Sequence, residues 1–68
     1  MSPSADITPY RLLIVEDEAL IAEETADRLT RLGYQVLGIA DTGPQAIAMA
    51  QQLQPDLVLM DIRLKGAM

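Results

Sequence analysis

The chain contains no cysteine and no histidine. Their absence excludes thiolate catalysis, a Cys/His zinc site and an imidazole general base, and it leaves no disulfide to support a small fold. No apolar run approaches the roughly 20 residues that a membrane-spanning helix needs. Residues 1–9 are polar, contain two prolines and lack the charged start and apolar core of a secretory signal. These absences predict an intracellular, cytoplasmic protein.

Basic charge is also scarce, with 5 Lys and Arg against 10 Asp and Glu and a formal net charge of −5. A chain of this charge is not attracted over long range to nucleic acid or to an anionic membrane, so neither is expected as a direct partner. Its 68 residues suit one small domain. A domain of that size buries only about 60% of its unfolded surface and is marginally stable as a monomer.

Two apolar runs end on acidic residues. Leu12–Val15 leads into Glu16–Glu18, and Leu57–Met60 leads into Asp61. A short continuous apolar run is typical of a strand that is buried on both faces. Carboxylates at the carboxyl ends of such strands face the crevice where open α/β sheets bind ligands. If the two strands are neighbours, the acids converge, and their charge favours a divalent cation with oxygen ligands.

The rest of the chain alternates between helix and strand patterns. We expect a loose N-terminal arm over residues 1–9, strands over 11–15, 35–40 and 57–61, and helices over 19–32 and from Pro44 to just before Pro55. The first helix should end at Gly33, because glycine adopts the left-handed conformation without steric cost. The second helix should bury Ala46, Ile47, Ala50 and Leu53, and Met49 and Met60 are also expected in the core. This alternation predicts an α/β fold with three parallel strands in the order 2-1-3 and one helix on each face.

The residues around the two acidic strand ends resemble a known family. Leu12–Glu18 reads LLIVEDE, Asp56–Leu64 reads DLVLMDIRL, and Asp61 lies 44 positions after Asp17. This pattern is similar to the receiver domain of two-component response regulators, over about Arg11 to Gly66. The resemblance implies a flavodoxin-like fold, which in full has five strands. Residues 10–68 are therefore interpreted as the N-terminal half of a receiver, truncated after the third strand.

The resemblance also implies roles for individual residues. Asp61 corresponds to the phosphoacceptor, which takes a phosphoryl group from a histidine kinase or a phosphotransfer protein. Asp17 corresponds to a direct Mg²⁺ ligand, Glu16 to an acid that holds the ion through water, and Arg63 to the position whose backbone carbonyl binds the metal. The protein is thus expected to be a phosphoprotein of a phosphorelay rather than an enzyme that turns over substrate.

The family's switch hydroxyl and phosphate-binding lysine have no counterpart in this sequence. They follow the fourth and fifth strands, and we interpret Thr25, Thr42 and Lys65 as poor substitutes for them. An alternative function is therefore a receiver fragment that is not phosphorylated and acts as a docking or dimerisation module. The open edge of the third strand also predicts a homodimer or higher oligomer, in which self-association completes the fold.

A metal-dependent phosphatase or nuclease is a further alternative. Both classes call for a second acid two residues after Asp61, as a general acid or as a second metal ligand. Arg63 occupies that position, which disfavours both.

Overall fold

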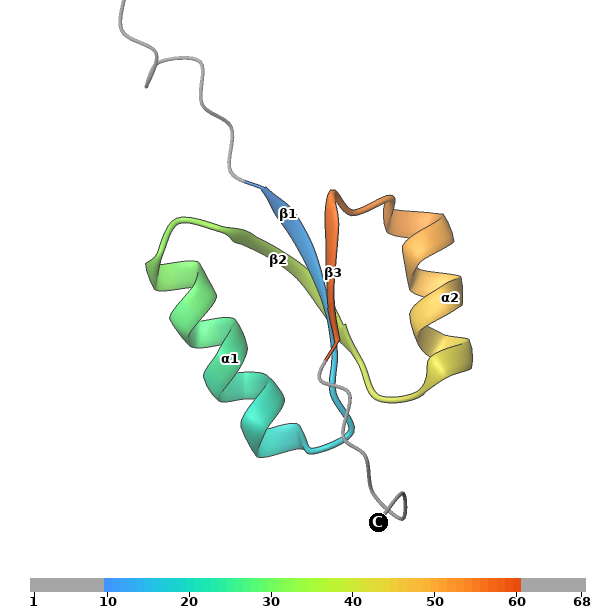
Figure 1. Ribbon diagram of the computed structural model, residues 1–68, viewed down its shortest axis with the longest axis horizontal. Helices are drawn as coiled ribbons and strands as arrows, with labels where there is room; N and C mark the ends of the chain where they lie inside the picture. Colours follow the sequence, from blue (N-terminus) through green and yellow to red (C-terminus); the bar gives the residue numbers. More distant parts are fainter. Residues whose placement is uncertain (1–9, 61–68) are drawn as a thin grey trace, which may run out of the picture.

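A computed structural model of the chain describes residues 10–60, in which strands and helices alternate (Figure 1). The elements are β1 (Arg11–Val15), α1 (Ala19–Arg31), β2 (Gln35–Ala40), α2 (Gly43–Leu53) and β3 (Leu57–Met60). The strands are parallel and lie in the order β2-β1-β3, which confirms the predicted topology. Within residues 10–60, neither helix is long and apolar enough to cross a membrane. The predicted arm over residues 1–9 lies outside the described residues.

The two helices lie on opposite faces of the sheet, so the fold has three layers (Figure 1). Because β1 is the central strand, both of its faces are covered, and Leu12, Leu13 and Ile14 are buried in succession. Ala22 of α1 and Ala46 of α2 are buried against the two faces. The continuous apolar run in β1 is therefore explained by its place in the middle of a parallel sheet. The expectation that Met60 lies in the core was wrong, because β3 pairs on one side alone among residues 10–60 and Met60 is 49% exposed.

The helix ends follow from local sequence chemistry. Gly33 has a φ of +102°, as expected for a glycine just beyond a helix. The helix α1 ends at Arg31, one residue earlier than predicted. Thr42 caps α2, because its Oγ1 accepts a hydrogen bond of 3.2 Å from the backbone N–H of Gln45. Pro44 is consequently the second residue of the helix rather than the first. The hydroxyl of Thr42 thus has a structural role as a helix cap.

The prediction for the buried face of α2 was wrong at one position. Ile47 is 63% exposed, whereas Met49 is partly buried. Met49 lies over Gly38 of β2, where an added Cβ would come within 2.6 Å of the Met49 Cε. Glycine at this point lets the helix approach the strand closely, so the helix turns its methionine rather than its isoleucine toward the sheet.

The side chain of Arg11 ties the start of β1 to the end of α2. Its Nη1 donates a hydrogen bond of 2.9 Å to the carbonyl of Gln54, and its Nη2 donates one of 2.8 Å to the carbonyl of Leu53. Carbonyls at the end of a helix lack intrahelical partners, and a cation beside them is favourable. The backbone N–H of Arg11 also donates to Asp56 Oδ2 at 2.8 Å. These bonds position β3 next to β1.

We expect Arg11→Met to lower the free energy of unfolding by about 1–2 kcal/mol, because it keeps the aliphatic stem but removes both side-chain donors. Arg11→Lys should lose less, since it retains the charge without the forked geometry. Urea denaturation followed by circular dichroism measures both. Equal stability of the Met variant and the wild type would show that these hydrogen bonds contribute nothing.

Candidate metal centre

The candidate site lies at the carboxyl edge of the sheet, where β1 leads into α1. The backbone N–H of Glu16 donates to the carbonyl of Ala40 at 2.9 Å, which continues the pairing of β1 with β2 by one residue. Glu16 therefore still belongs to the covered part of the sheet and is only 7% exposed. Asp17 and Glu18, which lie in the turn before the helix, are exposed.

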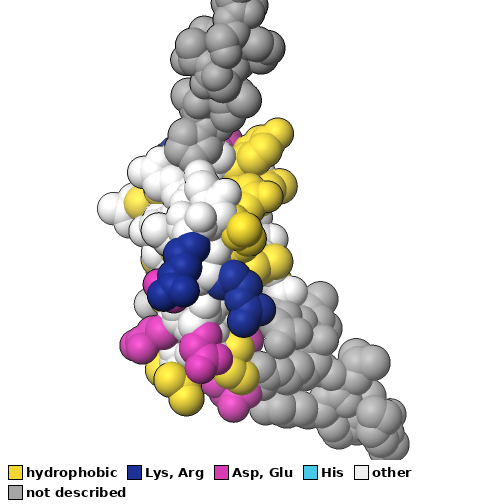
Figure 2. All heavy atoms as spheres, turned by 90° about the vertical axis from the view of Figure 1, so that its left-hand side faces the viewer, with side chains coloured by type: hydrophobic (Ala, Val, Ile, Leu, Met, Phe, Trp, Pro, Cys, Tyr) yellow, Lys and Arg dark blue, Asp and Glu magenta, His cyan; other side chains and the backbone are white. Residues whose placement is uncertain are grey.

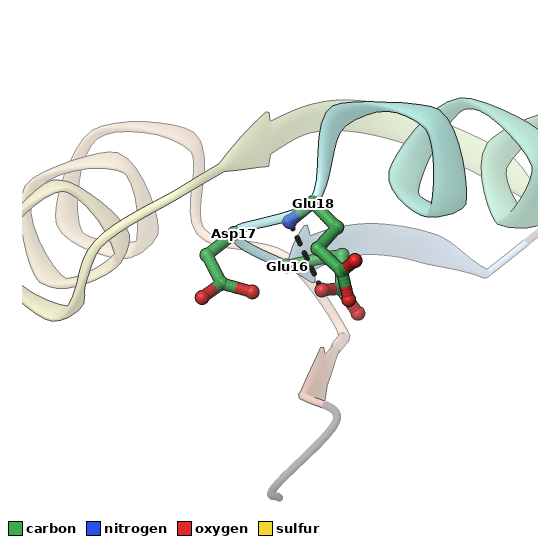
Figure 3. A group of neighbouring side chains, drawn as sticks. All are labelled: Glu16, Asp17 and Glu18. Atoms are coloured by element: carbon green, nitrogen blue, oxygen red, sulfur yellow. Dashed lines mark hydrogen bonds between the residues drawn. The ribbon is translucent and has the colours of Figure 1, made fainter.

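Glu16, Asp17 and Glu18 form a compact acidic group, shown in Figure 3. One carboxylate oxygen from each of the three lies within 4.8 Å of the others. The carboxylates of Glu16 and Glu18 lie side by side, and Asp17 projects from the other side of the turn (Figure 3). The backbone N–H of Glu18 donates to Glu16 Oε2 at 3.1 Å, which fixes the buried carboxylate within the turn.

The electrostatics of this group favour a bound cation. Three carboxylates this close repel one another, and burial of Glu16 deprives its charge of part of its hydration. The positive end of α1 offsets some of the repulsion. Oxygen donors from carboxylates are the ligands that Mg²⁺ and Ca²⁺ prefer, and Mg²⁺ characteristically uses one or two carboxylates and keeps several waters. The donor set therefore fits Mg²⁺.

A hollow of about 240 Å³ opens beside the acidic group. Its lining includes Glu16 and Asp17 from the end of β1, Asp41 from the end of β2, and Gln45 from the first turn of α2. Gln45 Oε1 accepts a hydrogen bond of 2.8 Å from the backbone N–H of Asp41, which fixes that turn. The space is large enough for an ion with its waters and is lined by acids from two strands.

The structure brings together two of the four predicted site positions. Glu16 and Asp17 lie in the acidic group, whereas Asp61 and Arg63 lie outside the described residues. Asp41 was missed, although its place directly after a strand was a usable signal. Glu18 was recognised as an acid of the loop but was not assigned to the metal.

Comparison with known proteins identifies the family. The family model described as "Response regulator receiver domain" matches residues 12–68. The chain belongs to this family. As a receiver, it is 45% identical over 56 residues to the "Transcriptional regulatory protein PdtaR" of Mycobacterium tuberculosis, covering 82% of this chain and 27% of that protein. It is also 42% identical over 52 residues to the "Chemotaxis protein CheY" of Thermotoga maritima, covering 76% of this chain and 43% of that protein.

A solved structure agrees with this assignment. The receiver resembles the crystal structure of the response regulator PhyR from Brucella abortus with a TM-score of 0.78 and 39% identity, over 90% of this chain and 25% of that one. The receiver thus spans between about a quarter and somewhat under half of the length of these relatives. Family and fold are confirmed as expected from the two acidic strand ends.

Proposed function

We propose that the chain is a phosphoacceptor receiver of a two-component phosphorelay, with Asp61 as the phosphorylated residue and Mg²⁺ as the cofactor. The observation that carries the proposal is the acidic group at the carboxyl edge of the sheet, in a chain of this family. The strand register supports it. Val15 pairs with Met60, and the residues that follow these two in the sequence are Glu16 and Asp61.

In this proposal Glu16 and Asp17 hold Mg²⁺, Asp17 directly and Glu16 through water, and Arg63 contributes its backbone carbonyl. Mg²⁺ held by these residues would neutralise the charge that develops during phosphoryl transfer. The burial of Glu16 and its hydrogen bond from the N–H of Glu18 hold one carboxylate in a fixed orientation before any ion arrives. Such preorganisation is the main contribution that a protein makes to phosphoryl transfer.

The transfer itself is a displacement at phosphorus. A carboxylate oxygen of Asp61 forms the new O–P bond, while the P–N bond of a phosphohistidine on the donor breaks and its electron pair stays on the imidazole nitrogen. The product is an acyl phosphate on the receiver. The partner is accordingly a histidine kinase or a phosphotransfer protein in the cytoplasm, and each receiver is modified once rather than turning over substrate.

Incubation with Mg²⁺ and a small-molecule phosphodonor, followed by intact mass measurement, tests the proposal. We expect a mass gain of one phosphoryl group, no gain in Asp61→Asn, and no gain when Mg²⁺ is chelated. Asp56→Asn is a matched control, since it changes the same residue type at the opposite end of β3 and should still gain the group. A folded protein that gains no mass would contradict the proposal.

The second candidate function is a docking or dimerisation module that is not phosphorylated. The observation in its favour is β3, whose four residues are all exposed although all are apolar. In the mass experiment, this candidate predicts a folded protein without any Mg²⁺-dependent modification.

A further inference from the structure

The hollow beside the acidic group receives a carboxylate from a second strand. Asp41 lies directly after β2 and lines this hollow of about 240 Å³ together with Glu16 and Asp17. Val15 of β1 pairs with Ala40 of β2, and the backbone N–H of Glu16 donates to the carbonyl of Ala40 at 2.9 Å. Because the two strand ends are joined in this way, Asp41 reaches the site from the side of β2.

The hollow has no basic side chain to balance its charge among residues 10–60. Besides these three acids its lining includes Glu23 of α1, and neither lysine nor arginine. The basic residues of α1, Arg28 and Arg31, lie in its last turn. Figure 2 shows this face of the molecule: acidic side chains gather toward the lower end, where α1 begins, and the basic ones lie higher along the helix. A bound cation is therefore what offsets the repulsion.

The carboxylate of Asp41 is suited to act on such a cation through water. Among residues 10–60 the close group of carboxylate oxygens consists of Glu16, Asp17 and Glu18 and does not include Asp41. Asp41 is exposed, and its carboxylate has no hydrogen-bond or ion-pair partner within the same residues. Mg²⁺ keeps several waters when it binds. A water between two polar groups is nearly as favourable as a direct hydrogen bond.

Gln45 fixes the turn that carries Asp41. Thr42 and Gln45 have the spacing of a capping box, in which the later side chain normally reaches back to the backbone N–H of the capping residue. Half of that motif is present, since Thr42 Oγ1 accepts a hydrogen bond of 3.2 Å from the N–H of Gln45. Gln45 Oε1 instead accepts from the N–H of Asp41, one residue before the cap, at 2.8 Å. The amide of Gln45 thus holds the backbone of Asp41.

We propose that Asp41 is an outer-sphere partner of the Mg²⁺ site and that Gln45 is the positioning residue that keeps it there. Asp41 accepts hydrogen bonds from waters of the ion, and Gln45 acts only through the backbone of Asp41. The inference rests on the proposed phosphoacceptor function, because it concerns the same ion. It extends the site from the end of β1 to the end of β2 and the first turn of α2.

Mg²⁺ titrations of the 68-residue chain, monitored by amide chemical shifts, test the role of Asp41. Asp41→Asn should weaken Mg²⁺ binding by about tenfold, the lower end of the loss that follows removal of an outer-shell partner. Glu24→Gln is the control, because it also removes one negative charge from an exposed acid but lines a different hollow on α1. It should stay close to the wild type, since salt at about 0.15 M screens distant surface charges. Equal losses in the two variants would overturn the role of Asp41.

Gln45→Met tests the positioning role without a change of charge. It should weaken Mg²⁺ binding, whereas Gln52→Met, the same substitution at an exposed position of the same helix, should not. Gln45→Glu keeps an acceptor for the N–H of Asp41 and should restore the affinity. Circular dichroism checks that each variant is folded. A side chain that served only the start of α2 would lower the free energy of unfolding but leave the Mg²⁺ affinity of the folded protein unchanged, and that result would overturn the role of Gln45.

The double variant Asp41→Asn/Gln45→Met shows whether Gln45 acts through Asp41. We expect it to bind Mg²⁺ no more weakly than Asp41→Asn alone, because no carboxylate is left to position. Losses that add would mean independent effects and would overturn the proposed coupling.

The wild type separates this inference from the proposed function. A folded wild-type chain that binds no Mg²⁺ contradicts both. A wild type that binds Mg²⁺ and is phosphorylated, beside an Asp41→Asn variant that matches Glu24→Gln in affinity, contradicts only the role of Asp41.

Discussion

Leu13→Ala is expected to lower the free energy of unfolding by about 2–5 kcal/mol. Leu13 has 0% of its surface exposed and is the largest side chain that is fully buried among residues 10–60. Removing a buried leucine side chain costs about 2–5 kcal/mol, because the transfer energy of the lost atoms adds to that of the cavity left behind. At about 0.05–0.15 kcal/mol per residue, a fold of roughly 50 residues has only about 3–8 kcal/mol in total. The loss is therefore comparable to the whole stability.

Circular dichroism and urea denaturation at matched protein concentration measure this effect. Leu20→Ala is the control: Leu20 is the same residue type, but it is 70% exposed on α1, so the change should stay within about 0.5 kcal/mol. The comparison needs equal concentrations because self-association would add to apparent stability. About 1 kcal/mol is the central value for the loss of stability in point mutants. If Leu13→Ala unfolds cooperatively with a free energy of unfolding within about 1 kcal/mol of the wild type, β1 is not the centre of the core.

The strands and their alternation with helices could be predicted from the sequence, but the apolar runs alone do not give the order of the strands. The run in β3 is as continuous as the run in β1, yet its four residues are exposed, whereas Leu12–Ile14 of the central strand are buried. The order 2-1-3 followed from placing the acidic ends of the first and third strands side by side. Gly33 likewise identified the end of α1 to within one residue, since a positive φ is needed there.

Other features of the fold depend on tertiary contacts that no local pattern reports. Ile47 and Met49 are both apolar and two positions apart in α2, and both were expected in the core, because periodicity among the surrounding alanines excludes neither. In the folded chain Met49 lies over Gly38 of β2, whereas Ile47 is exposed. The hydrogen bonds from Arg11 to the end of α2 join residues more than 40 positions apart, so they follow only from the finished topology.

The candidate site, like the fold, could be predicted from the sequence only in part. Glu16 and Asp17 were found because acids that directly follow a buried strand must lie at its carboxyl edge. The burial of Glu16 could not be read in advance, since it results from the backbone bond to Ala40 that extends the ladder by one residue. Asp41 lines the same hollow because β2 ends beside β1, a consequence of register rather than of local sequence.

Asp17→Asn is expected to weaken Mg²⁺ binding by about tenfold or more. Outer-shell partners of a metal already cost about 10–100-fold in affinity when they are removed, and in the proposed site Asp17 binds the ion directly. Glu18→Gln is a closely matched control, because both residues are exposed, lie in the same turn and lose one negative charge when amidated. Its loss should be clearly smaller, since Glu18 is no ligand in the proposed site. Its backbone N–H still donates to Glu16.

Mg²⁺ titrations monitored by amide chemical shifts compare the two variants with the wild type, and circular dichroism checks that each is folded. A group that attracts cations only through its summed charge would lose equal affinity in both variants, because each carries one negative charge fewer. A specific site with Asp17 as a ligand instead separates them. Equal losses would therefore contradict the assignment of Asp17 and reduce the acidic group to a diffuse counterion patch, whatever the outcome at Asp61.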